Sequence, residues 1–124
     1  MMSIQTSAHG PVHPVVITPA DSRVRVLAGG EVIADTARAL SLKEASYPSV
    51  LYIPPEDVCM NLLVRTDRHT HCPYKGDASY FSIVTPKGRR ENAAWSYERP
   101  IANVARIAGY LAFYPDRVDA IEEA

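Results

Sequence analysis

The sequence predicts a mainly β fold, with two small antiparallel sheets and one or two short helices. Short runs rich in β-branched and aromatic residues recur along the chain, and several alternate polar with apolar side chains, as half-buried strands do. Glycines or prolines separate most of these runs, which is typical of tight turns between antiparallel strands. Few segments have the spacing of a helix, so we expect sheets to build most of the structure.

The expected strands of the first half are bounded by proline and glycine. Residues 15–17 are β-branched and lie between two prolines, which suits a strand at the edge of a sheet. Arginine alternates with valine over 23–26, and Gly29 and Gly30 then supply the positive φ angles of a hairpin turn. The strands expected in this half are residues 15–17, 23–26, 31–34, 40–44 and 50–53.

Two short helices and three further strands are expected in the second half. The first helix is expected at 56–63, because Pro54 and Pro55 suit a first helical turn and two carboxylates follow them. The second is expected at 101–108, where apolar residues have helical spacing after Pro100. The expected strands are residues 79–84, 92–97 and 110–114, and the polar stretch 65–71 lies outside them.

Length and charge limit the classes of function. With 124 residues the chain has the size of one domain, which we expect over 14–119, between a flexible N-terminal arm at 1–13 and an acidic tail at 120–124. A net charge of −1 gives no electrostatic reason to expect a nucleic acid or an anionic membrane as partner. The sequence shows no bilayer-spanning apolar stretch, no secretory signal pattern and only 2 cysteines, so we expect a cytoplasmic protein.

The densest group of chemically active side chains lies at residues 71–77, with the sequence HCPYKGD. A thiol, an imidazole, a phenol, an ammonium group and two turn residues within one short segment predict a ligand-binding or catalytic loop. Lys75, Gly76 and Asp77 are the predicted contacts for an anion or polar ligand, because Gly76 lets the backbone turn tightly and leaves amide groups free beside the Lys75 ammonium. The alternative is a turn whose charged side chains are simply solvated.

Cys72 is a candidate nucleophile, because a thiol beside His71 and Lys75 can have a lowered pKa. The alternative is a packed thiol, since cysteine is among the most commonly buried residues. A redox pair with Cys59 is a further variant. His69, His71 and Cys72 also resemble a metal cluster, but no fourth ligand lies at a standard spacing, so we predict no bound metal.

Aromatic and acidic residues elsewhere complete the candidate site. Trp95 and Tyr97 share one face of an expected strand and predict a pocket wall, with Tyr74 of the loop as a further ligand contact. The alternative is that these rings fill the core. Glu44 and Glu91 are candidate general acids or bases if either carboxyl group lies beside the loop.

Three motifs carry a family resemblance: HCPYKGDASY at residues 71–80, ENAAWSY at 91–97 and GYLAFYP at 109–115. Together with Glu44, Tyr52-x-Pro54, Asp57 and Pro100, they resemble the family catalogued as domain of unknown function 427, which is also labelled nucleotidyltransferase-like. The resemblance covers nearly the whole chain. It implies a β-tent (Mss4-like) fold, in which two antiparallel sheets meet at an angle, as in methionine sulfoxide reductase B.

Many β-tent proteins hold zinc with paired Cys-x-x-Cys motifs, which this chain lacks, so no zinc site of that type is expected. The cofactor is otherwise left open. No glycine-rich phosphate loop and no closely paired metal-binding aspartates support the nucleotidyltransferase label.

These residues predict a small-molecule-binding domain. A polar or cyclic ligand would lie between the 72–77 loop and the strand of Trp95 and Tyr97, with Lys75 contacting an anionic or carbonyl group. One alternative is an enzyme, a transferase acting on a nucleotide or other phosphorylated substrate, with Glu44, Glu91 or His71 as acid or base. The other is a protein-interaction module that exposes its aromatic strands.

Overall fold

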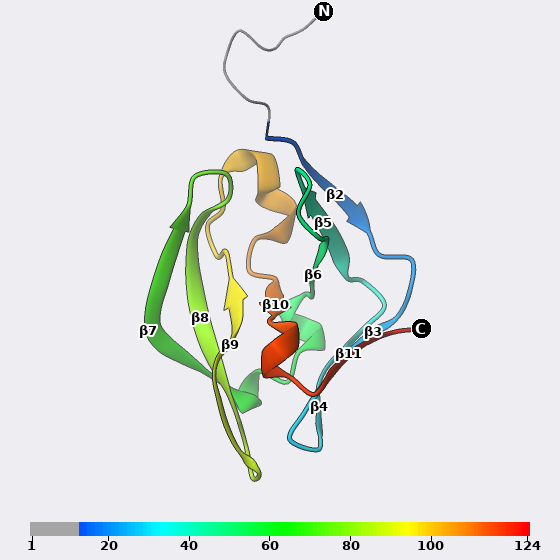
Figure 1. Cartoon of the computed structure of the whole chain (residues 1–124), viewed down its shortest axis with the longest axis vertical. Coiled ribbons are helices and arrows are strands. Elements are labelled where there is room, and N and C mark those ends of the chain that lie inside the picture. The colour runs from blue at the N-terminus through cyan, green and yellow to red at the C-terminus, as the bar shows by residue number, and fades with distance from the viewer. Residues whose placement is uncertain (1–12) are drawn as a thin grey trace, which may run out of the picture.

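The structure, a computed structural model, describes residues 13–124 and confirms that the fold is mainly β (Figure 1). Residues 1–12, which make up most of the expected N-terminal arm, lie outside the described residues. The strands are β2 (Val15–Pro19), β3 (Val24–Ala28), β4 (Glu31–Thr36), β5 (Leu40–Glu44), β6 (Val50–Tyr52), β7 (Leu63–Cys72), β8 (Gly76–Thr85), β9 (Gly88–Ser96), β10 (Leu111–Phe113) and β11 (Ala120–Glu123).

The strands form three antiparallel sheets rather than the two predicted from the sequence. The largest has the order β10-β9-β8-β7, and the smaller two have the orders β11-β3-β4 and β2-β5-β6. The additional division falls between β4 and β5. At the end of β4 the Thr36 hydroxyl accepts a hydrogen bond from the Arg38 N–H at 2.9 Å and donates one to Asp57 at 2.7 Å. This turn directs the chain away from β4, and β5 then pairs with β2 and β6. The β-tent arrangement stays a prediction.

The two expected helices are short 3₁₀ turns. The helix predicted at 56–63 is interrupted because Val58 leaves the helical path and pairs with Ala34 of β4. In the segment predicted at 101–108, Val104 has φ −122° and ψ 27°, which breaks the helical run. The turns are η2 (Pro55–Asp57), η3 (Met60–Leu62), η4 (Ala102–Ile107) and η5 (Pro115–Arg117).

Two strands form where the sequence pattern predicts none. β7 includes the polar stretch 65–71, and it pairs with β8 at the edge of the largest sheet. Its exposed charged side chains suit an edge strand, because charge discourages pairing with other chains. β11 forms within the expected acidic tail and pairs with β3, with Ile121 opposite Val26.

A bulge between β8 and β9 sets the register of the central strands. Asn92 has φ +48°, a left-handed conformation that asparagine tolerates better than most residues. Its N–H donates to the Ser82 hydroxyl at 3.0 Å, and its side-chain oxygen accepts from Thr66 at 2.6 Å. Beyond the bulge, Trp95 of β9 lies opposite Tyr80 of β8. The bulge therefore fixes which face of the sheet Trp95 occupies.

The interior divides into two clusters of buried side chains. The first, here called the aliphatic core, includes Val24, Val26, Ile33, Ile53, Phe81, Ile83, Leu111 and Phe113. The second, here called the tyrosine core, includes Leu40, Leu42, Tyr52, Ala78, Tyr80, Tyr97, Val104 and Ile107. In Figure 1 the largest sheet faces the two smaller ones, and buried side chains of both clusters come from the two sides.

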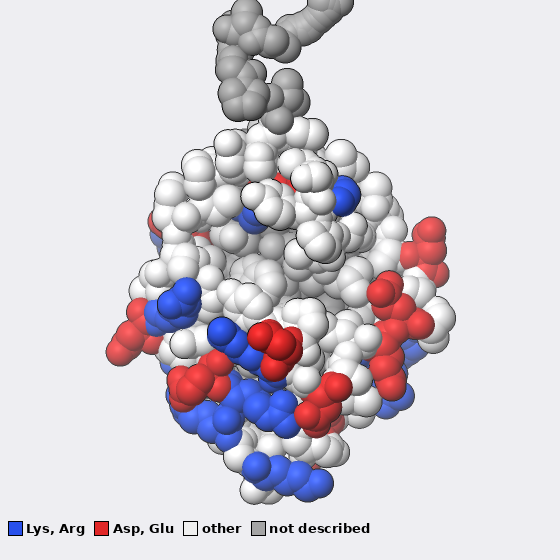
Figure 2. All heavy atoms as spheres, viewed as in Figure 1, with Lys and Arg blue, Asp and Glu red and all other residues white. Residues whose placement is uncertain are grey.

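Charged side chains are unevenly distributed over the surface. On the face shown in Figure 2, charged side chains gather over the lower half and the flanks. The centre of this face is hollowed and is bordered mainly by uncharged residues. Within residues 13–124, none of the helical segments has the length and apolar character that crossing a membrane requires.

Candidate functional site

A cavity of about 190 Å³ borders the tyrosine core. Five tyrosines and Trp95 supply most of its walls, and Lys75 and Glu44 are its charged residues. The tyrosines that line it are Tyr47, Tyr52, Tyr80, Tyr97 and Tyr114. The structure thus brings together Lys75, Glu44, Trp95 and Tyr97, four of the residues selected from the sequence, although they come from distant segments. We call this space the tyrosine cavity.

The backbone of the β7–β8 turn directs Lys75 into the protein. The Lys75 N–H donates to the Cys72 carbonyl at 3.1 Å, and the Lys75 carbonyl accepts from the Ile101 N–H at 3.0 Å. Gly76 has φ +114°, and a Cβ atom there would lie 3.4 Å from the Arg99 carbonyl oxygen. Glycine therefore meets a conformational need, and the segment before η4 packs closely over the turn.

Lys75 forms an ion pair with Glu44 of β5, and both side chains are largely buried, at 9% and 17% exposure. The second carboxylate oxygen of Glu44 lies 2.6 Å from His13 Nε2. Burial raises the pKa of the Glu44 carboxyl, but hydrogen bonds from Lys75 and His13 outweigh that effect and lower it below the usual value. Glu44 is therefore ionised at neutral pH, and it neutralises the Lys75 ammonium.

The aromatic side chains are held by contacts of their own. Trp95 Nε1 donates to the Tyr52 hydroxyl at 3.3 Å, and the Trp95 ring lies 4.5 Å from that of Tyr114. The Tyr80 hydroxyl lies 2.9 Å from that of Thr70. Tyr97 is buried, and no hydrogen bond joins its hydroxyl to another group among residues 13–124.

Three phenols of the cavity, those of Tyr52, Tyr97 and Tyr114, stay protonated at neutral pH. Burial raises the pKa of Tyr52 and of Tyr97 above the usual value for tyrosine. Burial also raises the pKa of Tyr114, to about 12. Each hydroxyl can therefore donate a hydrogen bond, and none of the three can act as a base at neutral pH.

The remaining residues of the HCPYKGD loop lie apart from the cavity lining. His71 and Asp77 are exposed and contact each other at 2.7 Å across the β7–β8 hairpin. Cys72 lies on the opposite side of β7 from His71 and packs, half-buried, against the tyrosine core. Tyr74 is exposed and stacks on His13, with ring centroids 3.6 Å apart.

Glu91 also lies outside the cavity lining. It pairs with Arg89 of the same strand, and its side chain is 64% exposed. No three His, Cys, Asp or Glu side chains in the described part of the chain converge on a possible metal position. Cys59 and Cys72 are both free thiols.

Sequence reasoning did not assign Tyr52, Tyr80, Tyr114 or His13 to the site. Tyr52 ends β6 two residues before Pro54, and Tyr114 follows β10 directly before Pro115; both lie within the motifs that carry the family resemblance. Their place in these motifs could have identified them as site residues. His13 had no signal, because only the folded chain brings it to Glu44, 31 positions away.

Comparison with known proteins identifies a family model that matches the chain. The model described as "Domain of unknown function (DUF427)" matches residues 16–124, which is most of the chain. The comparison with curated proteins finds no match.

Proposed function

Since the chain belongs to the DUF427 family, its activity has to be inferred from its own site, and we propose that it binds a small, neutral, ring-shaped compound in the tyrosine cavity. The observation that carries this proposal is the Lys75–Glu44 ion pair inside an aromatic cavity. The pair offers hydrogen bonds without net charge, and the rings offer flat apolar surfaces. Together they suit a ligand with a polar edge and an apolar face.

Lys75 and Tyr97 can both donate hydrogen bonds to such a ligand. An ammonium group has three N–H donors, and Glu44 engages one of those of Lys75. The Tyr97 hydroxyl donates to no group among residues 13–124, and the Lys75 nitrogen lies 5.9 Å from the centre of the Tyr97 ring. A carbonyl oxygen of the ligand would accept from both, while its ring would lie against Trp95.

The same contacts favour binding over phosphoryl or nucleotidyl transfer. A phosphorylated substrate brings at least one negative charge, and Lys75 is the single Lys or Arg that lines the cavity in the described part of the chain. Glu44 already neutralises it, so an anion would meet a carboxylate as well as an ammonium. His71 and Glu91, the other acid–base candidates, lie outside the lining.

Thermal unfolding tests the proposal directly. Succinimide and γ-butyrolactone are neutral ring compounds with carbonyl groups. Adenosine monophosphate and ribose 5-phosphate represent the phosphorylated substrates of the transferase alternative. A ligand that binds the native state raises the melting temperature by mass action. We expect the neutral compounds to raise it in the wild type and less in Tyr97→Phe.

The matched control is Tyr110→Phe, which removes a hydroxyl outside the cavity lining and should leave the shift unchanged. A shift with the phosphorylated compounds alone, lost in Lys75→Met, would replace this proposal with the transferase alternative. Failure of the neutral compounds to shift the transition at millimolar concentrations would contradict it.

A further inference from the structure

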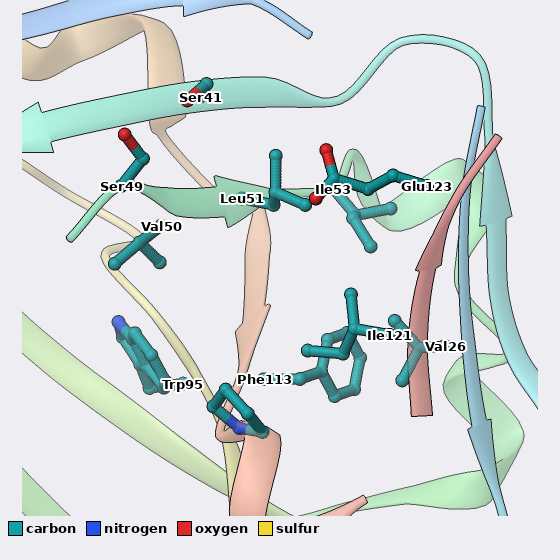
Figure 3. A pocket seen from close by; sticks show the side chains of 11 residues that line it. Val26, Ser41, Ser49, Val50, Leu51, Ile53, Trp95, Phe113, Ile121 and Glu123 are labelled. Atoms are coloured by element: carbon teal, nitrogen blue, oxygen red, sulfur yellow. The ribbon is translucent and has the colours of Figure 1, made fainter. Parts of the chain in front are cut away.

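A second hollow, of about 420 Å³, lies beside the tyrosine cavity and is lined mainly by apolar side chains. In Figure 3 the Trp95 ring closes one side of it, and Phe113, Ile121 and Val26 lie on the other. Leu51 of β6 covers it between these two sides, and Ile121 comes from β11. We call this space the apolar hollow.

The apolar hollow and the tyrosine cavity are neighbours. Val50 and Trp95 line both of them. The tyrosine cavity alone, at about 190 Å³, is smaller than the roughly 300–1,000 Å³ typical of ligand sites, whereas the apolar hollow falls within that range. A ligand confined to the tyrosine cavity would leave a larger, more apolar space open beside it.

We propose that the ligand is amphipathic, with its polar ring in the tyrosine cavity and an alkyl or aryl tail that passes Trp95 into the apolar hollow. This inference rests on the proposed function and specifies the class of ligand. The tail is the part that this hollow can bind, because Leu51 and Ile121 are only partly buried in the described chain. Covering them with a hydrocarbon group removes apolar surface from water.

The rim of the apolar hollow restricts the end of the tail. Ser41, Ser49 and the Glu123 carboxylate provide its polar groups, and in Figure 3 their oxygens lie along one side, away from Phe113. A tail ending in a carboxylate or phosphate would be repelled by Glu123. An uncharged tail is therefore favoured, in keeping with a neutral head group at Lys75 and Glu44.

A series of γ-lactones separates the two parts of the site. γ-Butyrolactone carries the ring alone, and γ-hexalactone, γ-octalactone and γ-decalactone add alkyl tails of increasing length. Trp95 is the chain's single tryptophan, so its fluorescence and its indole N–H signal report on a residue that lines both spaces. Dissociation constants are measured for the full chain, the cavity variant Tyr97→Phe and two hollow variants, Leu51→Asn and Ile121→Asn.

We expect the wild-type dissociation constant to fall by about fourfold for each methylene group that enters the hollow. Leu51→Asn and Ile121→Asn should bind γ-butyrolactone as the wild type does and lose most of the gain from the tail. Tyr97→Phe should weaken all four lactones by a similar factor and keep the gain. The two hollow variants come from different sheets, so a folding defect in one leaves the other to decide.

Three results would overturn the inference, and they separate it from the proposed function. Binding of γ-butyrolactone with no gain from the tail would remove the hollow from the site and keep the proposed function. A gain that survives in both hollow variants would place the tail elsewhere. No binding by any lactone would reject both. Tail-dependent binding that Tyr97→Phe leaves unchanged would reject the ring site of the proposed function and keep only the apolar hollow as a binding site.

Discussion

The aliphatic core and the tyrosine core share strands but differ in the chemistry they bury. β8 passes through both: Ala78 and Tyr80 belong to the tyrosine core, and Phe81 and Ile83 belong to the aliphatic core. The aliphatic core buries hydrocarbon and phenyl groups. The tyrosine core buries phenols next to an ion pair, Lys75 and Glu44, so that one strand connects an ordinary interior with a polar cavity.

The aliphatic core and the tyrosine core are expected to contribute differently to the stability of the fold. Apolar burial stabilises without needing a partner group, whereas each buried polar group loses water and recovers the loss only through a hydrogen bond. A buried ion pair often contributes less stability than hydrophobic residues of similar size. Under the proposed function, the polar groups of the tyrosine core serve ligand binding more than folding, and their substitution should separate stability from binding.

The largest loss of stability is expected from Ile33→Ala in the aliphatic core. Ile33 is fully buried, at 0% exposure, and its truncation leaves a cavity, so the free energy of unfolding should fall by about 2–5 kcal/mol. Urea denaturation followed by Trp95 fluorescence measures the change. Val16→Ala, at a position that is 54% exposed, is the control and should cost less than about 0.5 kcal/mol. Equal losses at both positions would contradict the assignment of this core.

A smaller loss is expected from Lys75→Met, which leaves the Glu44 carboxylate without its main partner. Removing one member of a buried pair typically costs about 3–5 kcal/mol. Because Glu44 keeps His13 and is 17% exposed, we expect about 2 kcal/mol here, measured by the same urea transition.

The double variant Glu44→Leu/Lys75→Met sharpens the comparison. It removes both charges, so it should recover most of the stability, and without the Lys75 donor it should bind the proposed ligand more weakly than the wild type does. A double variant as unstable as Lys75→Met would show that the pair supports the fold in the same way as the aliphatic core does.

A smaller effect on the free energy of unfolding is expected when acid protonates Glu44. Burial raises its pKa, but hydrogen bonds from Lys75 and His13 lower it overall, below the reference value of 4.5. Unfolded Glu44 thus binds a proton more readily than folded Glu44. Its contribution is present above pH 4.5 and is lost as the pH falls through the folded pKa. The stability advantage of wild type over the double variant should therefore shrink below pH 4.5, as urea transitions across this range would measure.

Other carboxylates do not obscure this difference. The Thr36 hydroxyl lowers the pKa of Asp57, and Arg65 lowers that of Glu98, but both acids are present in both proteins. A constant difference between the two proteins from pH 6 to pH 3 would contradict the role given to Glu44.

The sequence predicted the aliphatic core better than the tyrosine core for a physical reason. Alternation in 23–26 reports directly which side chains turn inward, and Val24 and Val26 are fully buried. Lys75 gives no such signal, because its burial depends on Glu44, which lies 31 positions away, and on the backbone of 99–101 above the turn. Composition selected the segment that carries Lys75, because polar groups concentrated at a turn are visible locally.

Long-range pairing also explains the errors in secondary structure. β7 has no regular alternation, since its register with β8 shifts between Arg65 and His69, and only that pairing makes it a strand. The helix predicted at 56–63 fails because Val58 pairs with Ala34, which local spacing does not encode.

The smallest effect on stability is expected from Tyr97→Phe, compared with Tyr52→Phe. The Tyr52 hydroxyl accepts from Trp95, so its loss should cost about 1 kcal/mol, whereas the Tyr97 hydroxyl has no partner within residues 13–124 and should cost less than about 0.5 kcal/mol. Urea denaturation at neutral pH measures both.

Stability at alkaline pH also tests the role of the Tyr97 hydroxyl. Burial raises the folded pKa of Tyr97 above the reference value of 10, so the unfolded chain ionises first. Its contribution is present below pH 10 and is lost as the pH rises toward the folded pKa. Tyr97→Phe should therefore be nearly neutral at pH 7 and should lose less stability than wild type above pH 10. If Tyr97→Phe lowers the free energy of unfolding by more than about 1 kcal/mol at pH 7, the Tyr97 hydroxyl stabilises the fold. Polar groups of the tyrosine core would then contribute to folding, as the apolar side chains of the aliphatic core do.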